Sequence, residues 1–295
     1  MPQTTRLNII GCGRAGGTVA AALCATGSVE IGQVLNRSIE SARSAVEVLG
    51  QGRAIAEAKE FLEAGLWLIA TADGALETAS ESLSASGQNL SGTTVFHLSG
   101  RYGPEILAAC GRAGAELASV HPVRSMPRLE PRAELFRGTL CIAEGSPAAL
   151  RALEAPFVAA GAGWRKVEGL QRGLYHAALS VISNVTKGVI WKSQKWLEAA
   201  GLDSKTAAMA SHSLLSITTE DVFREGARHS ITGPVVRGDT STVEAHLHAL
   251  AHMGHHDSEV YRVLARTVLD LAVERGDLND DVRARFEALL GSAGD

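Results

Sequence analysis

The sequence has few aromatic side chains and no excess of positive charge. Aromatic residues make up 4% of the 295 residues, and the formal net charge at pH 7 is -4. A nucleic-acid-binding surface needs a basic face, or aromatic side chains on which bases can stack. We therefore expect no nucleic-acid partner.

Long apolar runs and paired cysteines are also missing. No stretch approaches the roughly twenty apolar residues of a membrane helix, and the first residues lack the pattern of a signal peptide. No two cysteines form a CxxC pair, so we expect reduced, mostly buried thiols. A cytoplasmic protein without membrane contact is the resulting expectation. The cysteines are Cys12, Cys24, Cys110 and Cys141.

What the sequence does contain is a first half in which short apolar strands alternate with helical patterns. Such alternation predicts a doubly wound, mostly parallel α/β sheet of the Rossmann type. The expected strands are residues 7–10, 29–35, 66–70, 94–98, 116–120, 139–143 and 164–167, and the expected helices include 16–25, 38–49 and 147–160.

After Gly169 the strand pattern stops and apolar residues recur with the period of a helix. We predict two domains: a Rossmann-type domain over residues 1–168 and an all-helical domain over 169–295 that completes the substrate site. The expected helices are 170–200, 204–225, 241–275 and 280–290, with a loop over 230–240.

A GxGxxG sequence lies directly between the first strand and the first helix. In this setting Gly11 permits a tight turn, Gly13 lets the backbone approach a pyrophosphate, and Gly16 allows the helix to pack closely on the strand. The helix N-terminus also favours phosphate charge. A glycine-rich turn without a ligand is the alternative. The predicted dinucleotide contacts here are Gly11, Gly13, Arg14, Ala15 and Gly16.

The end of the second strand indicates which dinucleotide is bound. NAD sites usually carry an acid there, but this chain has Asn36, Arg37 and Ser38, and no acid until Glu40. A 2′-phosphate suits a guanidinium with added donors, so the pattern favours NADP. Alternatively, Arg37 is simply a solvated arginine in a turn.

Three further strand ends carry polar residues at the same edge of the predicted sheet. Thr71 and Ala72 are predicted to line the cofactor groove, whereas we interpret Asp73, with Glu77 behind it, as a helix N-cap. Ser99 follows another strand as a further cofactor contact. The remaining two residues, His97 and His121, suit either a site or a structural hydrogen bond.

In the helical half, His176, Ser180 and Asn184 recur every four residues and therefore share one helix face. Polar groups are costly to bury without partners, and facing a cofactor and a small polar substrate would satisfy them. Capping another helix or binding internal water are alternatives.

Arg237 precedes a predicted helix in which Ser241 and Glu244 suggest a capping box. An arginine beside a helix N-terminus suits an anion such as a substrate carboxylate. Pairing of Arg237 with Asp239 as a loop brace is the alternative.

Several of these motifs together resemble one group of proteins, the bacterial Rossmann-like oxidoreductases whose C-terminal half is a domain of unknown function. That group is similar in build to pyrroline-5-carboxylate reductase, ketopantoate reductase, 3-hydroxyisobutyrate dehydrogenase and deazaflavin-dependent NADP reductases. The motifs that carry the resemblance are residues 11–16, His97-Leu98-Ser99-Gly100, His121-Pro122, Tyr175-His176-Ala177-Ala178, Ser183-Asn184, Gly233-Pro234, Arg237-Gly238-Asp239, Thr242-Val243 and His246-Leu247.

The resemblance covers nearly the whole chain and implies NADP binding between the domains and a homodimer formed through the helices. Related dehydrogenases present a lysine and an asparagine from a helix of this region. Here His176, Ser180 and Asn184 match that face, and Lys187 is off it. The place of His246 in the motif implies a role near the loop.

Other histidines gather in the same stretch. Of these, His248, His252 and His255 share a helix face and could in principle hold zinc, but solvated histidines are common and no cysteine is near. We expect no metal site.

The sequence thus predicts an NADP-dependent oxidoreductase that transfers a hydride between NADP(H) and a small C=O or C=N compound, such as a 2-oxo acid. His176 is the predicted proton donor, Ser180 and Asn184 orient the substrate, and Arg237 holds its anionic end. Ketopantoate reduction, or NADP(H) sensing without turnover, are the alternatives.

Overall fold

The computed structural model describes residues 4–126 and 133–291 and divides into two compact units, residues 1–187 and 188–295. The first unit contains the whole sheet and also the first helix after it. The domain boundary expected at residue 168, where the strand pattern ends, stays a prediction.

The first unit is built on an eight-stranded sheet with the order β3-β2-β1-β4-β5-β6-β7-β8. All neighbouring strands are parallel except β6 and β7, which confirms the predicted mostly parallel sheet. The strands are β1 Thr5–Ile10, β2 Val29–Leu35, β3 Arg53–Ile55, β4 Leu66–Ile69, β5 Thr94–His97, β6 Glu116–Pro122, β7 Leu140–Gly145 and β8 Gly163–Lys166. Three-residue β3 was not predicted, since so short a segment shows no apolar pattern.

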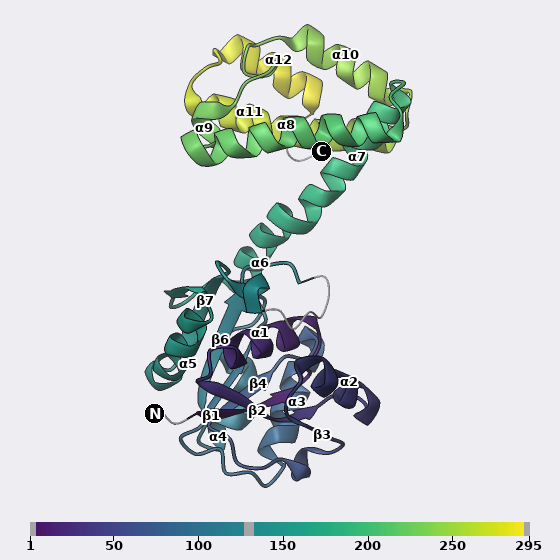
Figure 1. Cartoon of the computed structure of the whole chain (residues 1–295). Helices are drawn as coiled ribbons and strands as arrows, with labels where there is room; N and C mark the ends of the chain where they lie inside the picture. The colour runs from purple at the N-terminus through teal and green to yellow at the C-terminus, as the bar shows by residue number, and fades with distance from the viewer. Residues whose placement is uncertain (1–3, 127–132, 292–295) are drawn as a thin grey trace. The chain divides into compact units, whose positions relative to one another are not determined.

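Helices cover both faces of this sheet (Figure 1). Core residues of α1, α2 and α5 pack together on one face, and core residues of α3 and α4 pack on the other. The helices of this unit are α1 Arg14–Cys24, α2 Ile39–Leu49, α3 Leu76–Ser84, α4 Ala108–Arg112, α5 Pro147–Ala159 and α6 Arg172–Ser180; the short turns are η1 Ala58–Glu60, η2 Asp73–Ala75, η3 Pro104–Leu107 and η4 Ala133–Phe136, and the π-helical turn η5 is Val181–Val185.

Strand β4 is apolar at every position because each face of the sheet is covered. In β4, Leu66 and Leu68 join the core under α1 and α5, whereas Trp67 and Ile69 join the core under α3 and α4. Alternate side chains of a strand point to opposite faces, so a strand buried on both sides must be apolar throughout.

The strand order reverses between β1 and β4, since β1 pairs with β2 on one side and β4 on the other. At such a switch point the chain leaves the two strands in opposite directions, and a crevice opens at their carboxyl ends. The glycine-rich turn after β1 and Thr71 after β4 both lie at this edge.

The second unit has its own smaller core. Apolar side chains of α10, α11 and α12 pack with Val235 of the preceding loop around the buried Phe286. Its helices are the end of α7 Thr186–Ala199, α8 Ser204–Glu225, α9 Ala227–Ser230, α10 Thr240–Ala251, α11 His255–Arg275 and α12 Asp280–Leu290.

Two predictions about these helices are wrong. The single helix expected over residues 241–275 is broken at Gly254, whose φ of 149° no helix accommodates. The expected capping box of Ser241 and Glu244 is replaced by Asp239, which caps α10 two residues earlier by accepting a hydrogen bond from the Thr242 N–H at 3.0 Å.

All four cysteines are free and lie in the first unit, as the sequence indicates. Burial raises the pKa of Cys12 to about 11 and that of Cys141 to about 12. Burial is also the largest cause that raises the pKa of Cys24 to about 12. The pKa of Cys110 is also raised by burial. Because the thiolate is the reactive form, these thiols are poor nucleophiles in the folded chain. Among the described residues, no helix is long and apolar enough to cross a bilayer.

The aromatic cluster around Phe157 tests the packing of the sheet unit. Phe157 is fully buried and contacts the rings of Phe96, Phe136 and Trp164 at centroid distances of 5.4–6.0 Å. We expect Phe157→Ala to lower the free energy of unfolding by about 3–5 kcal/mol in denaturant titrations. Its neighbour Val158 is 51% exposed, and Val158→Ala should change the free energy of unfolding by less than about 0.5 kcal/mol. Equal effects of the two variants would contradict this packing.

Candidate functional site

The glycine-rich turn after β1 has the backbone that a dinucleotide site requires. Gly11 has a φ of 88°, and a Cβ there would lie 2.6 Å from the Thr71 nitrogen. A Cβ on Gly16 would lie 2.7 Å from the Gly11 carbonyl oxygen. Both glycines are therefore required by close packing of β1, α1 and the end of β4.

Gly13 differs from these two, since a Cβ there would meet nothing within 4 Å. It caps α1 without a side-chain hydrogen bond, and no acidic residue lies in the first turn of the helix. The positive end of the α1 dipole, with neither a side-chain cap nor an acid in the first turn, therefore suits an anion from outside. The space above Gly13 is where the backbone admits a phosphate.

A cavity of about 990 Å³ opens beside this turn and extends along the ends of β1, β2 and β4. Most of its lining is apolar or small, as cofactor sites usually are. The Thr71 hydroxyl is buried there and has no hydrogen-bond partner among the residues that the structure describes. Of the predicted cofactor residues, the cavity is lined by Gly11, Gly13, Asn36, Arg37, Ser38, Thr71 and Ala72.

At the end of β2 the predicted residues have different roles. The Asn36 amide accepts a hydrogen bond from the Cys12 N–H at 2.7 Å and donates one to the Ser41 carbonyl, so it holds the glycine-rich turn. Ser38 caps α2 by accepting from the Ser41 N–H. Arg37 is exposed and lines the cavity, and among the described residues it has no hydrogen-bonding or ion-pair partner.

The charge of Arg37 is not neutralised by the acidic residues nearest to it in sequence or in the described cavity lining. Glu40, in the first turn of α2, is not part of the lining. Glu57, which does belong to the described lining, forms an ion pair of 2.5 Å with Lys59. The end of β2 therefore suits an anionic group, as expected for a 2′-phosphate site.

Four predicted cofactor residues lie outside the lining. Gly16 is buried under the turn, Ala15 packs on the core, and the side chain of Arg14 is exposed at the start of α1. The Ser99 N–H donates to His97 Nδ1 at 3.1 Å, and its hydroxyl accepts from the Arg101 N–H. These residues shape the site without lining this cavity.

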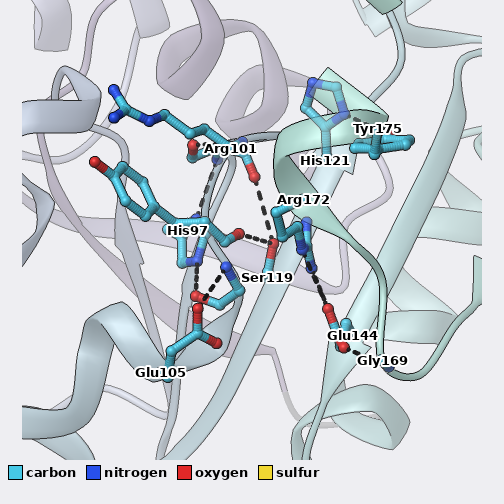
Figure 2. Close-up of polar contacts among 12 residues, drawn as sticks. His97, Arg101, Glu105, Ser119, His121, Glu144, Gly169, Arg172 and Tyr175 are labelled. Atoms are coloured by element: carbon cyan, nitrogen blue, oxygen red, sulfur yellow. Dashed lines mark hydrogen bonds and ion pairs between the residues drawn. The ribbon is translucent and has the colours of Figure 1, made fainter. Parts of the chain in front are cut away.

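A second group of polar residues lies at the carboxyl ends of β5 and β6, beside the start of α6 (Figure 2). His97 is fully buried, and because Nδ1 accepts from Ser99, Nε2 carries the proton and donates to the Gly103 carbonyl at 3.0 Å. Burial lowers the pKa of His97 to about 4. Of the two predicted alternatives for His97, the structural hydrogen bond fits these contacts.

His121, at the end of β6, bonds to a residue that the sequence did not single out for a role. Its Nδ1 shares a hydrogen bond of 2.7 Å with the hydroxyl of Tyr175 in α6. Burial, together with the nearby His176 and Arg172, lowers the pKa of His121 to about 4, so its imidazole is neutral at neutral pH. The two side chains point toward one another in Figure 2.

Arg172 and Glu144 fix the start of α6 to β7. Glu144 accepts from Arg172 Nε at 3.2 Å and Nη2 at 2.5 Å, and from the N–H of Gly169 at 2.9 Å. The side chains of Arg172 and Glu144 are 10% and 18% exposed. The third nitrogen, Arg172 Nη1, is buried without a hydrogen-bond partner in the protein.

Asp73 belongs electrostatically to this second group. The predicted N-cap role is wrong, because Asp73 begins the short turn η2, and α3 starts only at Leu76 without a side-chain cap. Instead, the Asp73 carboxylate acts on His97 and His121 in the direction that raises their pKa values, against the larger effect of burial. The segment 71–73 thus connects the cavity lining to the histidines.

The predicted stripe of His176, Ser180 and Asn184 runs into a π-helical turn. α6 ends at Ser180, and the turn over Val181–Val185 contains Asn184. The Thr186 hydroxyl donates to the Val181 carbonyl at 2.8 Å, and the same carbonyl accepts from the Thr186 N–H. Such turns occur frequently at functional sites. His176 and Asn184 are exposed, and Ser180 is half-buried.

Arg237 lies in the second unit, exposed just before α10. Asp239 accepts from the Thr242 and Ser241 hydroxyls at 2.6 and 2.8 Å and from the Thr242 N–H, and these bonds lower its pKa to about 2, with Arg237 contributing least. No ion pair joins Arg237 to Asp239 among the described contacts, so the predicted anion-binding role stays open.

The remaining histidines show no metal arrangement within residues 4–126 and 133–291. His246 Nδ1 shares a hydrogen bond of 2.7 Å with the Tyr261 hydroxyl, and His252 Nδ1 shares one with the His248 carbonyl. Asp257 forms an ion pair with Lys192. The side chain of His255 lies outside the described part.

The chain carries two recognised domains. Residues 2–122 match the family model described as a Rossmann-like domain, and residues 139–268 match the model described as domain of unknown function DUF2520. This is the combination that the sequence motifs implied. No curated protein matches the sequence.

Solved structures share the fold at low sequence identity. A protein of Bacteroides fragilis named as an NADP oxidoreductase matches with a TM-score of 0.73 and 19% identity over 90% of this chain and 98% of its own. An imine reductase from a Pseudomonas species matches at 0.65 and 18%, over 97% and 100%. Pyrroline-5-carboxylate reductase of Coxiella burnetii matches at 0.58 and 15%, over 99% and 100%.

The two buried histidines predict acid sensitivity of the sheet unit. In the unfolded chain a histidine binds a proton below its ordinary pKa of 6.5, whereas folded His97 and His121 stay neutral down to about 4. The unfolded state therefore binds more protons between these values, and stability falls as the pH falls from 6.5 toward 4.

We expect His97→Gln to be less stable than the wild type at neutral pH. In denaturant titrations between pH 6.5 and 4, however, its free energy of unfolding should fall less steeply, by up to about 1.4 kcal/mol less per pH unit. His212→Gln changes an exposed histidine of α8 and should keep the wild-type slope. A His97→Gln slope equal to wild type would contradict the burial of a neutral His97.

Proposed function

We propose that this chain, which joins a Rossmann-like domain to the DUF2520 domain, is an NADP-dependent oxidoreductase acting on a small C=O or C=N compound. The observation that carries the proposal is the cavity at the switch point, with an open α1 N-terminus, an unpartnered Thr71 hydroxyl and an unpaired Arg37 along one edge. The named neighbours of the same fold, an NADP oxidoreductase, an imine reductase and a pyrroline-5-carboxylate reductase, support this class.

The residues of the first unit suit NADP at defined places. The open backbone at Gly13 and the N-terminus of α1 would take the pyrophosphate, and Arg37 with the hydroxyl-rich start of α2 would take the 2′-phosphate. The buried Thr71 hydroxyl would form a hydrogen bond with the cofactor. NADPH supplies a hydride to the substrate carbon; the protein's part is to orient the substrate, exclude water and provide a proton.

For the substrate, we propose Ser180 and Asn184 as orienting groups and Arg237 for an anionic end such as the carboxylate of a 2-oxo acid. The sequence also predicts His176 as the proton donor, and its side chain is exposed. Ketopantoate reduction is one specific case, and NADP(H) sensing without turnover is the rival function. Oxidation of NADPH on addition of a 2-oxo acid or a cyclic imine separates turnover from sensing, and its absence would favour the sensor. The role of His176 is tested together with Tyr175 below.

Calorimetric titration with NADPH and with NADH tests the cofactor. We expect micromolar binding of NADPH and much weaker binding of NADH. Arg37→Ala should weaken NADPH binding about 10- to 100-fold, because one charged hydrogen-bonding partner of the 2′-phosphate is lost. Arg43→Ala, on the exposed side of α2 and outside the cavity lining, should bind NADPH as the wild type does.

Equal affinities for the two cofactors, or an Arg37→Ala variant that binds NADPH normally, would contradict the choice of NADP. If neither cofactor binds, the oxidoreductase proposal loses its main support.

We also propose a homodimer formed through the helices. Large apolar side chains are exposed along the segment from α6 to α8 in the single chain, and exposed apolar residues of this kind often mark interfaces. They include Leu174, Ile182, Trp191, Met209, Leu214, Ile217 and Phe223, which is 86% exposed.

Analytical ultracentrifugation should give about twice the chain mass of 30.9 kDa. Phe223→Glu should shift the protein toward the monomer, because a charge in a packed apolar interface is costly. Leu62→Glu, at an exposed apolar position of the first unit, is the control and should stay dimeric. A wild-type protein that sediments as a monomer would rule the dimer out.

A further inference from the structure

The hydrogen-bonded pair of Tyr175 and His121 has no role in the function proposed above. We propose that Tyr175 is the residue that protonates the reduced substrate, and that His121 positions its hydroxyl and returns a proton to it. The inference rests on the proposed oxidoreductase function and assigns one step of that reaction to a residue other than His176.

The pair is built with closely defined geometry. The Tyr175 hydroxyl and His121 Nδ1 are 2.7 Å apart, and the two rings meet edge to face at a centroid distance of 5.5 Å and an angle of 85°. A Cβ on Gly100 would lie 2.8–3.0 Å from three atoms of the imidazole ring. The glycine of the His97-Leu98-Ser99-Gly100 motif therefore provides the space in which the His121 ring lies.

Both partners are held by their surroundings. His97 bonds to the loop on either side of Gly100, through the Ser99 N–H and the Gly103 carbonyl. Glu144 fixes the start of α6 through Arg172 and Gly169, one turn before Tyr175. A donor held by a rigid loop and a buried ion pair needs little reorganisation when the proton moves.

Asp73 relates the pair to the segment that lines the cofactor cavity. Thr71 and Ala72 line that cavity, and the next residue, Asp73, interacts electrostatically with His121. The charged and titratable groups that act on His121 come from three elements: Asp73 of η2, His97 of β5, and Arg172 and His176 of α6. The segment after β4 therefore supplies both lining residues of the cavity and a carboxylate that acts on His121.

The proton step balances with the groups present. Reduction of a C=O or neutral C=N bond by hydride leaves an electron pair on oxygen or nitrogen, and this atom takes the proton as the Tyr175 O–H bond breaks. The phenolate oxygen receives the proton of His121 Nδ1, and His121 Nε2 takes one from water. A neutral imidazole can pass a proton this way because one ring nitrogen accepts while the other donates.

Arg172 assists this step from its position beside the pair. Burial raises the pKa of Tyr175, and the positive charge of Arg172 offsets part of this rise. A positive charge near the phenol stabilises the phenolate as the proton leaves. By contrast, His176 is exposed, and none of the described contacts fixes its side chain.

Steady-state kinetics of NADPH oxidation with pyruvate and with 1-pyrroline tests the assignment. Tyr175→Phe keeps the ring and removes only the hydroxyl; we expect kcat to fall about 10²- to 10⁴-fold with NADPH binding unchanged. Tyr102→Phe is the matched control, since the Tyr102 hydroxyl has no partner among the described residues, and it should keep the wild-type kcat. His176→Gln should lower kcat much less than Tyr175→Phe.

The positioning role of His121 has its own readouts. His121→Phe should lower kcat, and the double variant with Tyr175→Phe should be no slower than Tyr175→Phe alone, because the two residues act as one unit. In the protein without cofactor, nitrogen NMR of His121 should show a hydrogen-bonded Nδ1 that is lost in Tyr175→Phe and retained in Tyr102→Phe.

The possible failures are distinguishable. A Tyr175→Phe variant as fast as the wild type, or a larger loss in His176→Gln, would overturn the Tyr175 assignment while leaving the oxidoreductase intact. Additive effects of His121→Phe and Tyr175→Phe, or an unchanged nitrogen signal, would overturn the positioning role of His121. A wild-type protein that oxidises NADPH with neither compound would refute the catalytic function and the proton donor together.

Discussion

The close approach of the Gly11 backbone to the backbone of Ala70 and Thr71 is the contact on which the site depends. No side chain fits between them, so the turn after β1 lies directly against the end of β4. This contact places the α1 N-terminus, the Asn36 amide and the Thr71 hydroxyl around one cavity. It also places Asp73 near the histidines of the neighbouring strands. A larger residue at position 11 would separate both halves of the site.

The polar residues at the ends of β5 and β6 form a layered arrangement rather than a single catalytic cluster. Buried His97 organises the loop after β5, and the absence of a side chain at Gly100 makes room for His121. His121 in turn holds Tyr175, whose helix is tied to the sheet by Glu144. Each layer is neutral or internally paired, which reduces the cost of burying so many polar groups.

Much of this was predictable from local patterns. The GxGxxG spacing, the missing acid after the second strand and the alternation of strands and helices all depend on residues close in sequence, and they predicted the fold and the cavity lining. Contacts between distant segments were not predictable. His121 and Tyr175 are 54 residues apart, and Arg172 and Glu144 are 28 apart. The break at Gly254 was missed because helical periodicity continues across it. The cap of α10 was misplaced because Asp239, only two residues before Ser241, was interpreted as a partner of Arg237.

The four thiols, of which Cys12, Cys110 and Cys141 are buried and Cys24 is half-buried, give the protein an internal reporter of motion. All lie in the first unit, distributed over the glycine-rich turn, the end of α1, α4 and β7, and the chain has no cysteine after Cys141. Since burial keeps them protonated, alkylation requires the surrounding structure to open first. The rate at which each thiol is labelled thus measures how often its own part of the sheet unit opens. Labelling at Cys12, whose N–H bonds to Asn36, would follow the opening of the cofactor turn itself.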